Sequence, residues 1–211
     1  KQIAKLKDVK FYEGLGSVYD KTQRLRKLSG MLADEFNLNK EKAEIAASIS
    51  KSDLCSDLVN EYPDLQGLLG KYFALSQGFE EDVSNAVSDH YLPLGNNSMT
   101  SKKPISYIVA IADKIDTLVG FFLINEKPTS SKDPFALRRS AIGLLRTIID
   151  NKLNLKLRNL ISYNIKLLEE QGVRKTNENS ENEILNFLKE RMKNILKDKN
   201  IKNDIIEASI S

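Results

Sequence analysis

The stretch PISYIVAIADKIDTLVGFFLIN, residues 104–125, decides the fold. Pro104 suits the first turn of a helix, and the apolar residues after it recur at helical spacing on nearly every side. A helix with this pattern is expected to lie among other helices. It falls short of the roughly 20 uninterrupted apolar residues that cross a bilayer, because Asp113, Lys114 and Asp116 interrupt it. We therefore predict an all-α protein, with this segment as its most buried helix and no membrane association.

Start signals for further helices lie on both sides of this segment. Short polar side chains cap the free N–H groups of a first helical turn, and proline is tolerated at the first helical position. A serine followed three residues later by glutamate is the capping-box pattern. The predicted starts are Ser17, Asn39 (with one helix running on to Tyr62), Asp133 with Pro134 as first residue, and the box Ser180–Glu183.

A polar stretch near residue 174 divides the chain. RKTNENS follows the predicted helix end at Gly172 and precedes the capping signal at Ser180. We predict a main domain over 1–172, a linker over 173–180, and a second, shorter unit over 181–211. Since the chain begins without Met, we expect it to be part of a longer protein.

Composition gives broad limits. Apolar residues make up 41% and charged residues 29% of 211 residues, which is ordinary for a globular chain. The net charge of +3 combines +5 over residues 1–27, −5 over 28–150 and +3 over 151–211. Basic ends are compatible with a nucleic-acid partner, although such a charge alone is weak evidence. The single cysteine excludes an internal disulfide framework and fits the cytoplasm.

Several kinds of catalytic site lack their residues. With His90 as the only histidine and Cys55 as the only cysteine, no Cys/His zinc cluster can form. GLLGK, residues 67–71, has the wrong spacing for a phosphate-binding loop. His90 beside Asp89 suggests a base and its orienting carboxylate, but a capping or packing role is the more favoured interpretation. We predict no catalytic residue and no metal site in this chain.

Asp113 and Asp116 are three residues apart and share one helix face. Such a pair could bind Mg²⁺ or serve acid–base chemistry. The favoured alternative is a structural pair held by arginine. Arg138 interrupts the apolar stripe of SSKDPFALRRSAIGLLRTII, residues 130–149, and a buried arginine must be paired. We therefore predict an ion pair between Arg138 and Asp113 or Asp116, with Arg139 and Arg146 exposed.

Several stretches, in the same order, resemble one family, the β subunit of bacterial heterotetrameric glycyl-tRNA synthetase. The KDPFALRR segment is highly specific, and the resemblance covers nearly the whole chain. Near the end, FLKERMKNILKDKNIKNDIIEASIS is similar to the opening of that subunit's anticodon-binding domain. The other stretches are GSVYDKTQRLRKLSG (16–30), KSDLCSDLVNEYPDLQGLLGKYFA (51–74), SDHYLP (88–93), IADKIDTLVGFF (111–122) and PTSSKDPFALRRSAIGLLR (128–146).

The resemblance implies an HD-domain-like helical bundle followed by the first helices of an α-helical anticodon-binding domain. It further implies a non-catalytic part of a cytoplasmic glycine–tRNA ligase, whose α subunit holds the class II centre and uses ATP and Mg²⁺. The implied partners are glycine tRNA, the α subunit and the remaining domains of the β subunit. Hydrolytic HD domains bind metal through several histidines and a His-Asp pair. Here Ser52 precedes Asp53, so that the metal centre is incomplete.

Three functions remain open from the sequence. The first is tRNA binding, with phosphate contacts from basic side chains. The second, disfavoured by the missing histidines, is an HD-type metal-dependent phosphohydrolase using Asp53, Asp113 and His90. The third is a protein-interaction scaffold without salt-dependent RNA affinity. On the first interpretation, the candidate tRNA-binding residues are Lys21, Arg24, Arg26, Lys132, Arg139 and Arg146.

Overall fold

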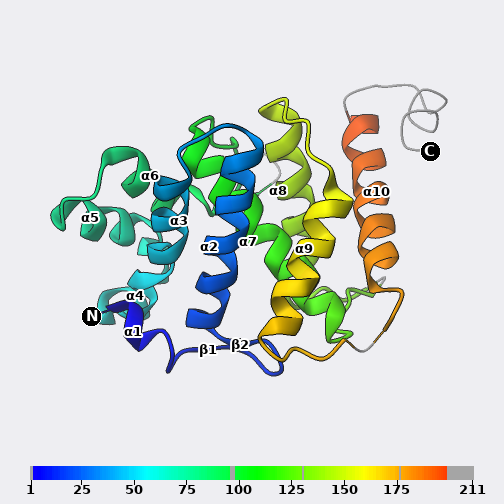
Figure 1. Cartoon of the computed structure of the whole chain (residues 1–211), viewed down its shortest axis with the longest axis horizontal. Coiled ribbons are helices and arrows are strands. Elements are labelled where there is room, and N and C mark those ends of the chain that lie inside the picture. Colours follow the sequence, from blue (N-terminus) through cyan, green and yellow to red (C-terminus); the bar gives the residue numbers. More distant parts are fainter. Residues whose placement is uncertain (1, 96–97, 130, 176, 199–211) are drawn as a thin grey trace.

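The computed structural model describes residues 2–95, 98–129, 131–175 and 177–198. Within these ranges the chain is helical, apart from one small antiparallel sheet near the N-terminus (Figure 1). The prediction of an all-α protein is confirmed. The elements are α1 (Gln2–Lys5), β1 (Lys10–Tyr12), β2 (Gly16–Ser17), α2 (Val18–Glu35), α3 (Lys40–Ile49), the 3-10 turn η1 (Ser52–Cys55), α4 (Asp57–Glu61), the 3-10 turn η2 (Pro63–Leu65), α5 (Leu68–Ser76), α6 (Glu81–Asp89), α7 (Pro104–Leu123), α8 (Leu137–Asp150), α9 (Leu157–Glu170) and α10 (Ser180–Asp198).

Helix α7 runs through the middle of the bundle (Figure 1). It packs against α2, α3, α6, α8, α9 and α10. Sixteen of its twenty residues are buried, as the apolar pattern around its whole circumference predicts. The buried set includes two charged residues, Lys114 and Asp116. No helix in the described ranges combines the length and apolar character that crossing a bilayer requires.

The predicted starts of α2 and α3 are confirmed. The Ser17 hydroxyl accepts from the Asp20 N–H at 3.2 Å, and the Asp20 carboxylate accepts from the Ser17 N–H at 2.8 Å. This reciprocal capping box fixes the first turn of α2. The Asn39 side chain accepts from the N–H of Lys42 at 3.0 Å and caps α3.

The helix predicted to run from Asn39 to Tyr62 is broken into α3, η1 and α4. The Ser50 hydroxyl donates to the Ala47 carbonyl, and the Ser52 hydroxyl to that of Ile49. Such side-chain bonds satisfy carbonyls that a continuing helix would use, which favours an end at this point. The apolar pattern was therefore correct for α3 but not for its continuation.

Two other starts differ from prediction in detail. Helix α8 begins at Leu137, because Ala136 adopts a left-handed conformation with φ of 52°. Asp133 still caps it, accepting from the N–H groups of Leu137 and Arg138 at 2.8 and 2.9 Å. Helix α10 begins at Ser180, but the expected box is not formed, since the Ser180 hydroxyl donates to the Asn177 carbonyl.

Helix α10 packs against α7, α8 and α9. Ile184, Leu188 and Ile195 belong to the same apolar core as the earlier helices. The boundary at 173–180 remains a prediction, although the described part of 181–211 already contacts the main bundle. Residues 199–211 of that predicted unit lie outside the described residues.

Candidate functional site

Asp116 is the centre of a charge network inside the bundle. Its carboxylate is fully buried, and Arg24 from α2 binds it in fork geometry, with Nε 2.6 Å from Oδ1 and Nη2 3.0 Å from Oδ2. Lys21, one turn earlier on α2, lies 3.1 Å from Oδ2. The amide nitrogen of Asn164, in the orientation that pairs donors with acceptors, lies 3.2 Å from Oδ1. Both carboxylate oxygens are thus used within the fold.

Asp113 continues the network toward a second lysine. Lys21 Nζ lies 3.2 Å from its Oδ1, and Lys51 Nζ lies 3.3 Å from its Oδ2. Lys51 Nζ also lies 2.7 Å from His90 Nε2 and 4.1 Å from the centre of the Tyr91 ring. The Lys51 ammonium therefore lies between a carboxylate, an imidazole and an aromatic face, each of which attracts a cation.

The contacts of His90 define its tautomer. Nδ1 is 2.9 Å from the Val87 carbonyl, which can only accept, so Nδ1 carries the proton. Nε2 then offers its lone pair to the Lys51 ammonium. Burial and the charge of Lys51 lower the pKa of His90 well below its usual value, which keeps the ring neutral. The packing role predicted for His90 is confirmed.

Lys114 is the fourth cation of this region. Its Nζ donates to the carbonyls of His90 and Leu92 at 3.0 and 2.7 Å. Burial lowers its pKa from 10.5 to about 8. Its methylene chain passes over Gly143 of α8, where an added Cβ would meet the Lys114 Cε at 2.8 Å. A side chain at position 143 would therefore displace Lys114.

Four cations thus surround two carboxylates. Burial alone would raise the pKa of Asp113, but the charges of Lys21 and Lys51 outweigh it and lower the pKa. The pKa of Asp116 is lowered in the same way, with Arg24 as the main opposing charge. Both carboxylates are ionised, and the surplus cations are satisfied by neutral acceptors. The arrangement is suited to holding α2 and α7 together, with Lys51 linking the segment after α3 to α7.

This network is not arranged as a divalent-metal site. Lys51 stands between His90 and Asp113, and Asp53 uses its Oδ2 to accept from the Gly67 N–H at 2.6 Å. No three metal-ligating side chains of the described residues come together. The three residues of the phosphohydrolase alternative therefore do not converge on one ion.

Lys21 and Arg24, two of the candidate tRNA-binding residues, lie inside the fold and not on its surface. They are 3% and 1% exposed. Both lie on the stripe that also holds Leu28 and Leu32, at spacings of three, four and seven residues, and this stripe faces α7. A phosphate outside the fold cannot reach them.

The predicted pairing of Arg138 with Asp113 or Asp116 is also wrong. The Arg138 guanidinium donates to the Thr129 carbonyl and lies 4.0 Å from the Asp133 carboxylate. The late start of α8 is one reason, because it places Arg138 in the first turn beside the loop. The fully buried stripe of α8 is a different one, formed by Leu137, Ala141, Leu144 and Leu145.

The remaining candidates stand on the surface to different degrees. Lys132 and Arg139 are exposed, as predicted for Arg139. Arg26 is exposed but paired with Glu44 at 3.0 Å. Arg146 is half-buried rather than exposed, because its guanidinium donates to the carbonyls of Gly95 and Ser98 at 3.1 and 2.8 Å.

The sequence did not single out Arg191 of α10. Its guanidinium lies 3.7 Å from the centre of the Phe187 ring. Burial and the positive charge of Arg138 lower the pKa of Arg191. Helices α8 and α10 pack against each other, so these two arginines lie on neighbouring helices. The packing of two helices whose residues lie more than fifty positions apart leaves no signal in the local sequence pattern. Arg138, Arg139 and Arg191, with Lys132 before α8, are called the α8–α10 cation group below.

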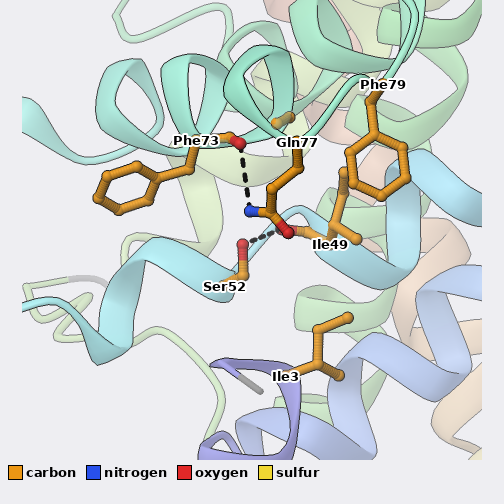
Figure 2. A pocket seen from close by; sticks show the side chains of 7 residues that line it. Ile3, Ile49, Ser52, Phe73, Gln77 and Phe79 are labelled. Atoms are coloured by element: carbon orange, nitrogen blue, oxygen red, sulfur yellow. Dashed lines mark hydrogen bonds between the residues drawn. The ribbon is translucent and has the colours of Figure 1, made fainter.

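An apolar pocket of about 280 Å³ lies beneath α5 (Figure 2). Its two polar side chains bond to nearby backbone, Gln77 to the Phe73 carbonyl at 3.1 Å and Ser52 to that of Ile49 at 2.8 Å. Ile3 and Phe79 complete much of its lining. None of the residues that line it has an ionisable side chain.

The fold and the closed network define a helical domain whose internal charges hold helices together. Comparison with known proteins supplies the family. The model of the family described as glycyl-tRNA synthetase beta subunit matches residues 1–211. The chain belongs to this family.

Curated relatives agree along the whole chain. Glycine–tRNA ligase beta subunits of Colwellia psychrerythraea, Clostridioides difficile and Rhodospirillum centenum are 40%, 40% and 39% identical to it. These matches cover 100%, 99% and 96% of this chain. They cover only 30%, 30% and 28% of the relatives, so the chain spans less than a third of their length.

Proposed function

We propose that this chain is a non-catalytic part of a glycine–tRNA ligase β subunit that contacts tRNA phosphates and docks other parts of the enzyme. Family membership over residues 1–211 supports the assignment to a β subunit. On this proposal the ligation of glycine to tRNA, with ATP and Mg²⁺, takes place on the α subunit. The buried network would hold α2 to α7, and the RNA-facing helices α8 and α10 pack against α7.

The packing of α10 against α8, which places Arg138 and Arg191 on neighbouring helices, is the observation that carries the tRNA contact. Burial and the positive charge of Arg138 both lower the pKa of Arg191, with Glu190 and Asp133 opposing the effect, so the two cations repel each other. A bound phosphate would relieve the repulsion and accept hydrogen bonds from both groups.

Two further cations extend this group. Arg139 and Lys132 are exposed, and no carboxylate among the described residues pairs with either. Contacts of this kind give affinity for the RNA backbone without reading its sequence. Of the six candidates from the sequence, Lys132 and Arg139 retain the exposure that phosphate contact needs, and Arg26 retains it in competition with Glu44.

A salt titration tests this proposal. The β subunit carrying this sequence, assembled with its α subunit, is titrated with glycine tRNA at increasing salt. We expect Arg139→Ala and Arg191→Ala each to flatten the plot of log K against log salt by about one phosphate contact. Lys40→Ala is the matched control, because Lys40 is exposed on α3 and already paired with Asp34. Unchanged slopes for both arginine variants would favour the scaffold alternative.

A further inference from the structure

Helix α5 has the composition of a buried helix but lies at one end of the molecule (Figure 1). Its sequence LLGKYFALS contains one charged residue, Lys71. Leu68, Tyr72 and Leu75, at spacings of four and three, share one face and are 46%, 60% and 39% exposed. A helix that is apolar all round is normally covered on all sides.

The opposite face of α5 is already in contact with the fold. Gly70 lies so close to α6 that an added Cβ would meet Val87 at 2.8 Å, and Ala74 is buried. The apolar pocket of Figure 2 lies beneath Phe73 and Gln77 on this inner side. The stripe of Leu68, Tyr72 and Leu75 therefore faces away from the bundle.

The preceding helix, α4, adds to this exposed apolar character. Leu58 and Tyr62 are one turn apart and 48% and 58% exposed. Five of the seven large apolar side chains that the described residues expose thus come from α4, α5 and the turn between them, the others being Leu94 and Met99. We call the side chains of Leu58, Tyr62, Leu68, Tyr72 and Leu75 the α4–α5 surface.

The charges among these residues are acidic. Asp57, Glu61 and Asp64 are exposed, and none of them forms an ion pair within the described residues. Lys71 is the only cation between Asp57 and Leu75. Unpaired carboxylates repel phosphate, which argues against RNA at this place and for a protein surface with basic groups at its edge.

We infer that the α4–α5 surface docks another domain of the same β subunit. That domain presents an apolar patch with lysine or arginine at its edge. In the relatives about 70% of the chain lies outside the region that matches these 211 residues. A domain on the same chain is present at a high effective concentration, so that a modest apolar contact suffices to hold it. This inference rests on the docking half of the proposed function and names its surface.

Photo-crosslinking in the assembled enzyme tests the inference. Tyr72 is replaced by p-benzoylphenylalanine in the full-length β subunit, with the same replacement at Met99 as an exposed control 84% open to solvent. We expect the Tyr72 position to crosslink to a peptide of its own β chain outside these residues, close to lysine or arginine. Crosslinks from Tyr72 to the α subunit, a second β subunit or tRNA, or none at all, would overturn it.

Thermal unfolding provides a second test, which does not depend on the crosslinking variant keeping its fold. Tyr72→Ser and Tyr72→Phe are compared in the full-length β subunit by thermal unfolding. If a domain covers Tyr72, the serine variant should lose roughly 2–4 °C in its unfolding midpoint and the phenylalanine variant almost nothing. Equal midpoints for both variants would contradict a covered position. Neither readout involves RNA affinity, so this inference and the tRNA contact can fail separately.

Discussion

The contact between α2 and α7 buries charged side chains, which usually lie on the surface. The α4–α5 surface does the reverse and exposes apolar side chains, which usually lie in the core. At the first, six charged side chains are largely removed from water and satisfy one another, with His90 and two carbonyls as neutral acceptors. At the second, five large apolar side chains face solvent beside carboxylates that form no ion pair within the described residues. The first region is closed within the fold, whereas the described part of the chain leaves the second uncovered.

The two regions therefore contribute to different properties of the protein, the first to the folded structure and the second to association. Charges that are paired inside a fold serve position, because moving any one leaves another unsatisfied in a medium of low dielectric. Apolar groups that remain partly exposed on a surface contribute less to folding than buried ones, and a cluster of them favours association. The following predictions test the two regions separately.

Removal of the central carboxylate should have the largest effect. Asp116→Ala leaves Arg24 and Lys21 buried without their shared partner, and we expect a loss of about 3–5 kcal/mol in the free energy of unfolding. Urea unfolding of the 211-residue chain measures it. Asp34→Ala, which breaks the exposed pair with Lys40, should cost less than about 1 kcal/mol. Similar losses for both would show that Asp116 is not the centre described here.

At alkaline pH the buried Lys114 should raise the free energy of unfolding. Its pKa in the folded state is about 8, below its ordinary value, so between about pH 8 and 10 the unfolded chain binds more protons. Stability from this group therefore rises with pH, by roughly 2 kcal/mol between pH 7 and 10. Lys114→Met removes this rise, and the difference between the two unfolding curves isolates it from other lysines. A difference that is constant with pH would argue against a depressed pKa.

Mild acid should destabilise the protein through His90. Its folded pKa lies well below the ordinary 6.5, so below that pH the unfolded chain takes up a proton that the folded chain refuses. The free energy of unfolding should fall by roughly 1.4 kcal/mol by pH 5.5. Because His90 is the only histidine, its imidazole signals in NMR report directly on the group. Titration of these signals near pH 6.5 would contradict a neutral, buried ring.

The central helix and the capped helix starts could be predicted, because apolar spacing and local capping are properties of neighbouring residues. The partners of the charges could not. Asp116 is held by Arg24, 92 residues away, and not by Arg138. Lys21 and Arg24 were assigned to the surface because charged residues usually lie there, yet their spacing from Leu28 and Leu32 already placed them on the buried stripe.

Features of the surface that depend on contacts between distant residues could not be predicted either. Exposure of Arg139 follows from its place on a helix face, but the proximity of Arg138 to Arg191 depends on how α8 and α10 pack. The α4–α5 surface could not be predicted from the sequence for a related reason. The apolar composition of LLGKYFALS favours a buried helix, and only the position of α5 at the end of the molecule shows Tyr72 to be 60% exposed.

The smallest effect is expected at that tyrosine. In the 211-residue chain Tyr72→Ser removes an exposed ring that faces away from the bundle, so the free energy of unfolding should change by less than about 0.5 kcal/mol. Phe122→Ser, in the buried core at 3% exposure, is the matched control and should cost at least about 3 kcal/mol. A large loss for Tyr72→Ser in this chain would mean that the ring already packs within the fold. The α4–α5 surface would then need no partner to explain its composition.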